Sequence, residues 1–131
     1  MNKFLKKYWL SIVVILIIFV LCLMDTTPLP PQPMSNFDKL VHTVMFLGLS
    51  GVVFFDTTGY LRFAVSNLEI FFSAFLFPIA IGGLVEIMQE YVSATRSGDW
   101  FDFLFNVVGA ILGLGIAFLI NNYFLKRKIR N

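Results

Sequence analysis

Long apolar runs separated by short polar segments dominate the chain. Runs free of Lys, Arg, Asp and Glu cover residues 8–24, 40–55, 70–85 and 103–125. A helix needs roughly 17 to 25 residues to cross the hydrocarbon core of a bilayer. The two middle runs reach that length only if Asp38 and Glu86 lie inside their helices. The pattern therefore predicts membrane-spanning helices at about 8–24, 37–55, 70–91 and 101–124.

Composition favours an integral membrane protein over a soluble domain. Of the 131 residues, 58% are hydrophobic and only 14% are charged, and the mean hydropathy is +0.82. A soluble domain of this length would expose far more charge. The net charge of +2 does not indicate a nucleic-acid partner, and a single cysteine excludes an internal disulfide. We expect one domain over residues 1–131, an all-α, four-helix transmembrane bundle surrounded by membrane lipids.

The first apolar run has a second interpretation, as a cleaved signal peptide. Lys3, Lys6 and Lys7 would form its basic region. However, no small-x-small cleavage site follows, because residues 22–24 are Cys, Leu and Met. The sequence therefore favours a retained first helix.

Basic residues predict how the chain is oriented. Three lysines precede the first predicted helix, Arg62 lies between the second and third, and four basic residues follow the fourth. The opposite side carries only Lys39 and Arg96. Because cytoplasmic segments of membrane proteins carry an excess of Lys and Arg, we expect both termini in the cytoplasm.

Ionisable side chains at one end of three predicted helices are the most unusual feature of the chain. Such groups are expensive at membrane depth and mark a functional site by default. At about 1.5 Å per residue, His42, Glu86 and Asn106 each lie roughly 6 to 8 Å inside their helix ends. We therefore predict a common polar pocket in the outer leaflet. Its polar groups, helix by helix, are Asp38 and His42, then Glu86, Gln89 and Glu90, then Asp99, Asp102 and Asn106.

Several of these residues also have a purely structural interpretation. Asp38 could stabilise a helix N-terminus, His42 could be a hydrogen-bonded structural residue, and Glu90 lies nearer to water. Glu86 is the hardest to explain in this way, because a buried carboxylate needs a cation, a proton or a donor. Arg96 is the candidate partner of carboxylates across the mouth of the pocket.

Small residues along the fourth predicted helix indicate close helix packing. Small side chains let two helices approach closely in lipid. Packing inside the bundle would turn Asp102 and Asn106 inward, whereas the alternative is a docking face for another membrane protein. The residues that share this side of the helix are Asp102, Asn106, Gly109, Gly113 and Ala117.

Three chemistries fit a histidine beside carboxylates. Metal ligation would use His42, Glu86 and Asp102, with a divalent ion as the candidate cofactor, but no compact motif such as H-E-x-x-H is present. Acid–base catalysis would use Glu86. Recognition of a lipid or peptide headgroup would use the whole mouth, with Arg96 contacting anionic groups and the carboxylates contacting amines.

The order and spacing of these residues resemble the VanZ-like family of small bacterial membrane proteins. The resemblance covers about residues 36–115 and implies a multi-pass protein of the bacterial cytoplasmic (inner) membrane. It also implies a link to the family's name-giving role in low-level teicoplanin resistance. The matching pattern is Asp38-Lys39-x-x-His42, Glu86-x-x-Gln89, Arg96 and Asp102-x-x-x-Asn106-x-x-Gly109. By the same resemblance, Asp38, His42, Glu86, Gln89, Arg96, Asp102 and Asn106 form one site.

These observations leave three functional hypotheses. The first is an envelope membrane protein that binds an amphipathic lipid, lipid-linked precursor or lipoglycopeptide, with a role in glycopeptide resistance. The second is an intramembrane enzyme, metal-dependent in one version, that acts on a lipid headgroup. The third is a structural subunit that packs with another membrane protein, or with a second copy, through the face of Gly109 and Gly113.

Overall fold

Helices form all the regular structure in the described part of the chain. The structure is a computed structural model, and it describes residues 2–24, 37–59, 64–93, 95 and 97–131. The first two spans are α1 (Lys3–Leu23) and α2 (Phe37–Thr57), and the last is α5 (Trp100–Arg130). The third is continuous and consists of α3 (Asn67–Ile70), the π-helix η1 (Phe71–Leu76) and α4 (Phe77–Tyr91). Each span is long and apolar enough to cross a membrane, which confirms the predicted all-α, four-helix membrane protein.

The helices extend beyond several of the predicted ends. α1 begins at Lys3, and the predicted start at residue 8 coincides with a kink, because Tyr8 has non-helical dihedral angles (φ −109°, ψ 18°). α5 continues to Arg130 instead of ending near 124. Its last turn carries Arg127, Lys128 and Arg130, and cations stabilise the negative end of a helix dipole. Both helices therefore continue through polar residues at the membrane surface. For this reason the apolar runs alone predict helices that are too short.

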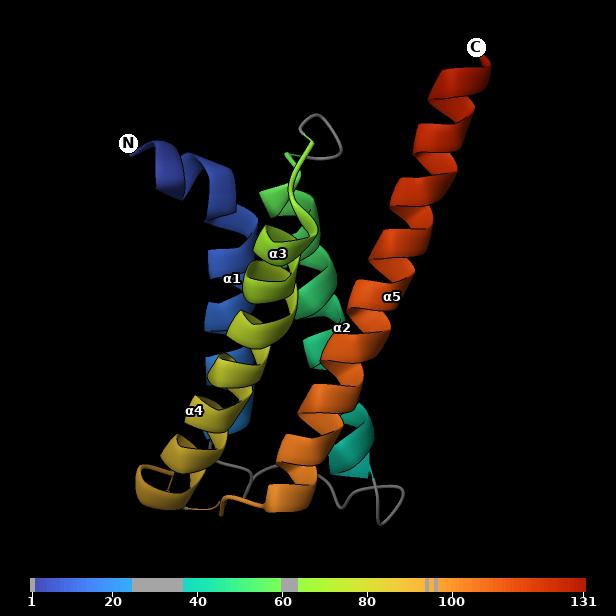
Figure 1. Cartoon of the computed structure of the whole chain (residues 1–131). Helices are drawn as coiled ribbons and strands as arrows, with labels where there is room; N and C mark the ends of the chain where they lie inside the picture. Colours follow the sequence, from blue (N-terminus) through green and yellow to red (C-terminus); the bar gives the residue numbers. More distant parts are fainter. Residues whose placement is uncertain (1, 25–36, 60–63, 94, 96) are drawn as a thin grey trace.

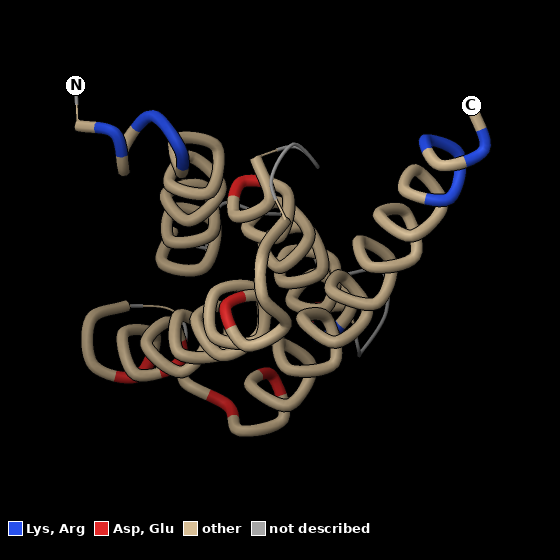
Figure 2. The backbone as a smooth tube through the Cα atoms, turned by 45° about the horizontal axis from the view of Figure 1, so that its top comes forward, with Lys and Arg blue, Asp and Glu red and all other residues tan. Residues whose placement is uncertain are grey.

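Both termini lie at the same end of the bundle, at the top of Figure 1. We call this the terminal end, and we call the opposite end, where α2 and α5 begin and α4 stops, the distal end. Most of the Lys and Arg that the structure describes lie near the two termini (Figure 2). This distribution is the one that the positive-inside rule associates with cytoplasmic termini, and the cytoplasmic orientation stays a prediction.

The third span contains a break in its regular hydrogen bonding, at Pro78. Proline has no N–H, so it cannot bond to the carbonyl four residues earlier, which belongs to Ala74. The hydroxyl of Ser50 in α2 donates to this carbonyl instead. Hydroxyl side chains of neighbouring helices commonly satisfy such freed groups in membranes. The π-helix η1 ends two residues before the proline, so the irregular hydrogen bonding is concentrated in this part of the third span.

The closest helix contact joins α5 to α2. A Cβ added to Gly109 would collide with the carbonyl oxygen of Thr43, and one added to Gly113 with the carbonyl oxygen of Leu47. The two backbones therefore touch, as small residues permit in lipid. α2 of the same chain covers this face of α5, so another membrane protein cannot dock there while the bundle is intact. The contact also holds the first turns of α5 against the first turns of α2.

Candidate functional site

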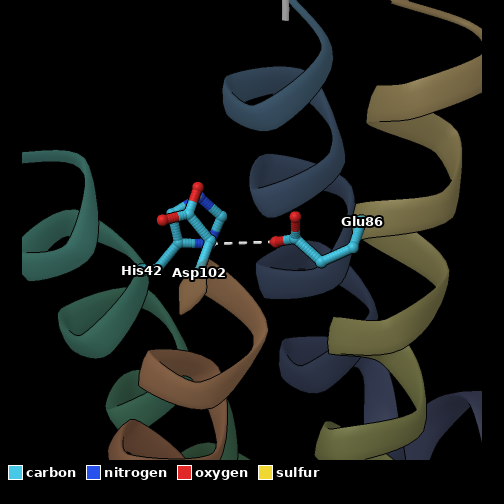
Figure 3. Close-up of side chains that lie close together, drawn as sticks. All are labelled: His42, Glu86 and Asp102. Atoms are coloured by element: carbon cyan, nitrogen blue, oxygen red, sulfur yellow. Dashed lines mark ion pairs between the residues drawn. The ribbon is translucent and has the colours of Figure 1, made fainter. Parts of the chain in front are cut away.

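Side chains from three helices meet at the distal end and form what we call the distal cluster: His42 of α2, Glu86 of α4, and Asp102 and Asn106 of α5. Figure 3 shows the imidazole of His42 beside the two carboxylates. All four residues are buried, and none is more than 8% exposed. His42 is the only histidine of the chain. Ionisable groups this deeply buried need partners inside the protein or a bound ligand.

The imidazole of His42 lies between the two carboxylates. Its Nδ1 is 2.8 Å from Oδ1 of Asn106 and 3.7 Å from Oε1 of Glu86. Its Nε2 is 3.8 Å from Oδ2 of Asp102. Because an amide oxygen only accepts hydrogen bonds, Nδ1 carries the proton in this contact. In the neutral ring Nε2 then offers its lone pair, and in the charged ring it offers a second N–H.

Glu86 is held by donors on both carboxylate oxygens. The backbone N–H of Asp99 donates to Oε2 over 2.9 Å, and Nδ2 of Asn106 donates to Oε1 over 3.5 Å. Asp99 itself accepts from the N–H of Phe101 and so caps the start of α5. The connection between α4 and α5 therefore positions Glu86 as well as the first turn of α5.

Asp102 is held by fewer hydrogen bonds than Glu86. It lies in the first turn of α5, where the positive end of the helix dipole favours a carboxylate. The ammonium of Lys39 lies 4.0 Å from its Oδ1, and this oxygen is buried without a hydrogen-bond partner. Nε2 of His42 is likewise buried without a partner. A buried polar atom in this state costs about 1–3 kcal/mol. Two such atoms on neighbouring side chains leave the cluster with unused hydrogen-bonding capacity.

The same geometry could hold a metal ion. His42, Glu86 and Asp102 each offer one ligand atom, and these three atoms lie within 4.8 Å of one another. Ligands around a zinc ion at bond lengths near 2.0–2.2 Å lie roughly 3–3.5 Å apart. Small side-chain rotations would therefore complete a site of one imidazole and two carboxylates.

The other residues that the sequence singled out lie around the cluster or outside it. Gln89 is buried, but its Nε2 donates to the backbone carbonyl of Cys22, so it ties α4 to α1. Glu90 is exposed and accepts from the N–H of Gly98. Asp38 is half-buried in the first turn of α2. Arg96 lies outside the described residues, as does the segment 25–36, which contains four prolines.

One buried carboxylate was not singled out by the sequence analysis. Asp56 was expected in the segment that follows the second helix, but α2 continues through it and leaves it 1% exposed. A sequence signal was present. The buried face of α2 recurs at helical spacing through Phe46, Ser50 and Val53, and the next positions on that face are Asp56 and Thr57.

Comparison with known protein families identifies a match over most of the chain. A family model described as VanZ/LLP1 matches residues 2–121. The matched range includes α1, whereas the resemblance found in the sequence began near residue 36. No match was found among the curated proteins or among the solved structures.

Proposed function

The chain belongs to the VanZ/LLP1 family of multi-pass membrane proteins, and from this premise we propose that its distal cluster binds the cationic headgroup of an amphipathic ligand. The ligand class comprises lipids, lipid-linked precursors and lipoglycopeptides, which combine a polar head with acyl chains. In this proposal the protein spans the bacterial cytoplasmic membrane with both termini in the cytoplasm. The distal cluster then faces the outside, where glycopeptides act.

The observation that carries the proposal is the excess of acceptors in the distal cluster. Two buried carboxylates share one imidazole, and Oδ1 of Asp102 has no hydrogen-bond partner. Lys39 lies 4.0 Å from this oxygen, too far for a hydrogen bond, so the ammonium group of a ligand would supply the N–H donor that it lacks. Hydrogen bonds between charged groups are the strong ones. Tyr91 and Trp100 lie at the adjoining helix ends, 83% and 82% exposed. Aromatic rings at the membrane surface suit contact with the apolar part of such a ligand.

Neutralising one carboxylate of the cluster is expected to weaken binding of a lipoglycopeptide about tenfold or more, since a hydrogen bond to a charged group contributes about 1.5–3 kcal/mol. The variants are Glu86→Gln and Asp102→Asn, both nearly isosteric. Binding would be measured by native mass spectrometry and by titration of the protein in nanodiscs. The matched control is Glu90→Gln, which removes the same charge from an exposed side chain one turn away.

A second probe tests whether the acyl chain of the ligand contributes to binding. The same glycopeptide scaffold without its acyl chain should bind more weakly than the lipoglycopeptide to the wild-type protein. Equal binding of the lipoglycopeptide to wild type, Glu86→Gln and Asp102→Asn would contradict the proposal.

The compact ligand triad supports a second candidate function, divalent metal binding. One imidazole and two carboxylates suit ions such as zinc, and a metal supplies Lewis-acid activation of a headgroup oxygen or of water. His42→Ala is then expected to remove a stoichiometric divalent ion that elemental analysis finds on the wild-type protein. Glu90→Gln should keep the ion. Wild-type protein that stays free of metal after exposure to zinc and manganese would exclude this candidate.

A further inference from the structure

A second buried polar group lies at the opposite, terminal end of the bundle. It centres on Asp56, in the last turn of α2. Oδ2 of Asp56 accepts two hydrogen bonds from Ser11 of α1, from the backbone N–H over 3.0 Å and from the hydroxyl over 2.6 Å. Oδ1 is buried and has no hydrogen-bond partner. Asp56 is thus as deeply buried as His42 and, like Asp102, has one oxygen unused.

A carboxylate at this position is electrostatically unfavourable unless a cation accompanies it. The C-terminal end of a helix carries the partial negative charge of its dipole, and the carboxylate of Asp56 adds a full negative charge there. Burial removes the water that would otherwise solvate it. The ion pairs found among the described residues all lie in and around the distal cluster, and none includes Asp56.

The hydroxyl groups around Asp56 are arranged as acceptors. Thr57 donates its hydroxyl proton to Ser73 over 3.2 Å, and Ser73 donates its own to the carbonyl of Glu69 over 2.7 Å. The hydroxyl of Tyr8 lies 3.3 Å from that of Thr57 and must be the donor there, because the Thr57 proton is already used. Each of these hydroxyl groups, like that of Ser11, therefore keeps lone pairs for a further partner. Each of the four hydroxyl protons is already used, so these hydroxyl groups offer a further partner oxygen acceptors only.

The helices that contribute these groups lose their regular geometry at this level. α1 is kinked at Tyr8, and Ser73 lies within the π-helix η1. Single π-turns occur frequently at functional sites, and irregular helices and helix C-termini coordinate monovalent cations in membrane transporters. Such irregular backbone at membrane depth is tolerated where it is buried in protein or lines a cavity.

A cavity lies beside this group. It has a volume of about 660 Å³, and its mostly apolar lining includes Ser11, which donates to Asp56, and Tyr8 and Ser73, whose hydroxyl groups both contact that of Thr57. Ser66 and Glu69, both exposed, also line it. The cavity therefore joins exposed polar groups at the terminal end to the hydroxyl of Ser11, which donates to Asp56.

We propose that Asp56 and the hydroxyl groups of Ser11, Thr57 and Ser73 bind a monovalent cation of the sodium type. A single carboxylate balances one positive charge, and the neutral oxygens suit a hard cation that prefers oxygen ligands. The group contains no nitrogen or sulfur ligand, which distinguishes it from the distal cluster with its imidazole. The bound cation would join α1, α2 and η1, and it would stabilise the helix contacts at the terminal end.

The test compares the thermal stability of the full-length protein in nanodiscs in sodium chloride and in choline chloride at the same ionic strength. The variant Trp100→Phe leaves Trp9, next to the kink of α1, as the only tryptophan and therefore as a local fluorescent reporter. Sodium is expected to raise the unfolding temperature and to change the Trp9 signal saturably. Asp56→Asn should abolish both responses while it keeps the acceptor for Ser11, and Ser73→Ala should raise the midpoint sodium concentration about tenfold or more. The control Glu90→Gln should respond as the wild type does.

Two results would overturn the proposal. The first is an unfolding temperature and a Trp9 signal that are the same in sodium and in choline. The second concerns Arg62, a cation six positions after Asp56 in the sequence and outside the described residues. If Arg62→Gln destabilises the protein as much as Asp56→Asn does, and sodium does not change the unfolding temperature of the wild type, the partner of Asp56 is this arginine. Sodium NMR line broadening that Asp56→Asn removes would establish binding independently of stability.

Discussion

Gly113→Ala is expected to destabilise the bundle by about 1–3 kcal/mol, the usual cost of overpacking, whereas Gly115→Ala in the same helix is expected to be harmless. The added methyl group at position 113 would collide with the backbone carbonyl of Leu47, which cannot rotate away as a side chain would. At position 115, a Cβ meets nothing within 4 Å. Because alanine favours a helix over glycine by about 1 kcal/mol in water, Gly115→Ala should equal or exceed the wild type in stability.

The measurement is denaturant unfolding of the purified protein in micelles, followed by circular dichroism. Gly109→Ala provides a second test, because its methyl group would collide with the carbonyl of Thr43. The two substitutions should lower the unfolding midpoint, and the control should not. Equal midpoints for Gly113→Ala and Gly115→Ala would mean that α5 does not pack against α2 as closely as the structure has it.

The sequence predicts the four spans and their class because apolar length is a local property. It also predicts that ionisable groups of three helices lie at one depth, because depth follows from distance along each helix. Which groups meet depends on how the helices are rotated and packed. His42 and Asn106 are in contact because glycines let α5 touch α2, and that face was recognisable at the sequence level as a line of small residues.

Contacts with the backbone are much harder to anticipate. Gln89 shares a helix face with Glu86, yet it donates to the carbonyl of Cys22, a group that carries no sequence signature. Asp56 was overlooked because the apolar run ends at residue 55, and helix boundaries are the least certain part of a sequence-based prediction. The hydroxyl groups that complete its surroundings belong to α1 and η1, which are distant in sequence. Sequence periodicity places residues on faces, but only the packing assigns their partners.

The single variant His42→Gln is expected to destabilise the protein by about 3–5 kcal/mol, the cost of leaving buried charges without their partner. The substituted amide can still donate to Asn106, but it no longer places an imidazole between Glu86 and Asp102. Among the described residues, Lys39, 4.0 Å from Asp102, would then be the one cation left to compensate the two carboxylates. Stability would be measured by the same unfolding experiment, with Glu90→Gln as the exposed control.

The decisive variant removes all the charges together, as His42→Gln, Glu86→Gln and Asp102→Asn in one chain. Replacing a complete buried ion cluster by well-packed hydrophobic residues of similar volume is often neutral or stabilising by about 1–4 kcal/mol, and amides of nearly the same volume likewise remove every buried charge. We therefore expect the triple variant to be at least as stable as the wild type, far more stable than His42→Gln, and unable to bind the lipoglycopeptide or a metal. Such separation of stability from binding is typical of functional sites, which keep costly groups for their chemistry. If the triple variant were less stable than His42→Gln, the role of the cluster would instead be to stabilise the bundle.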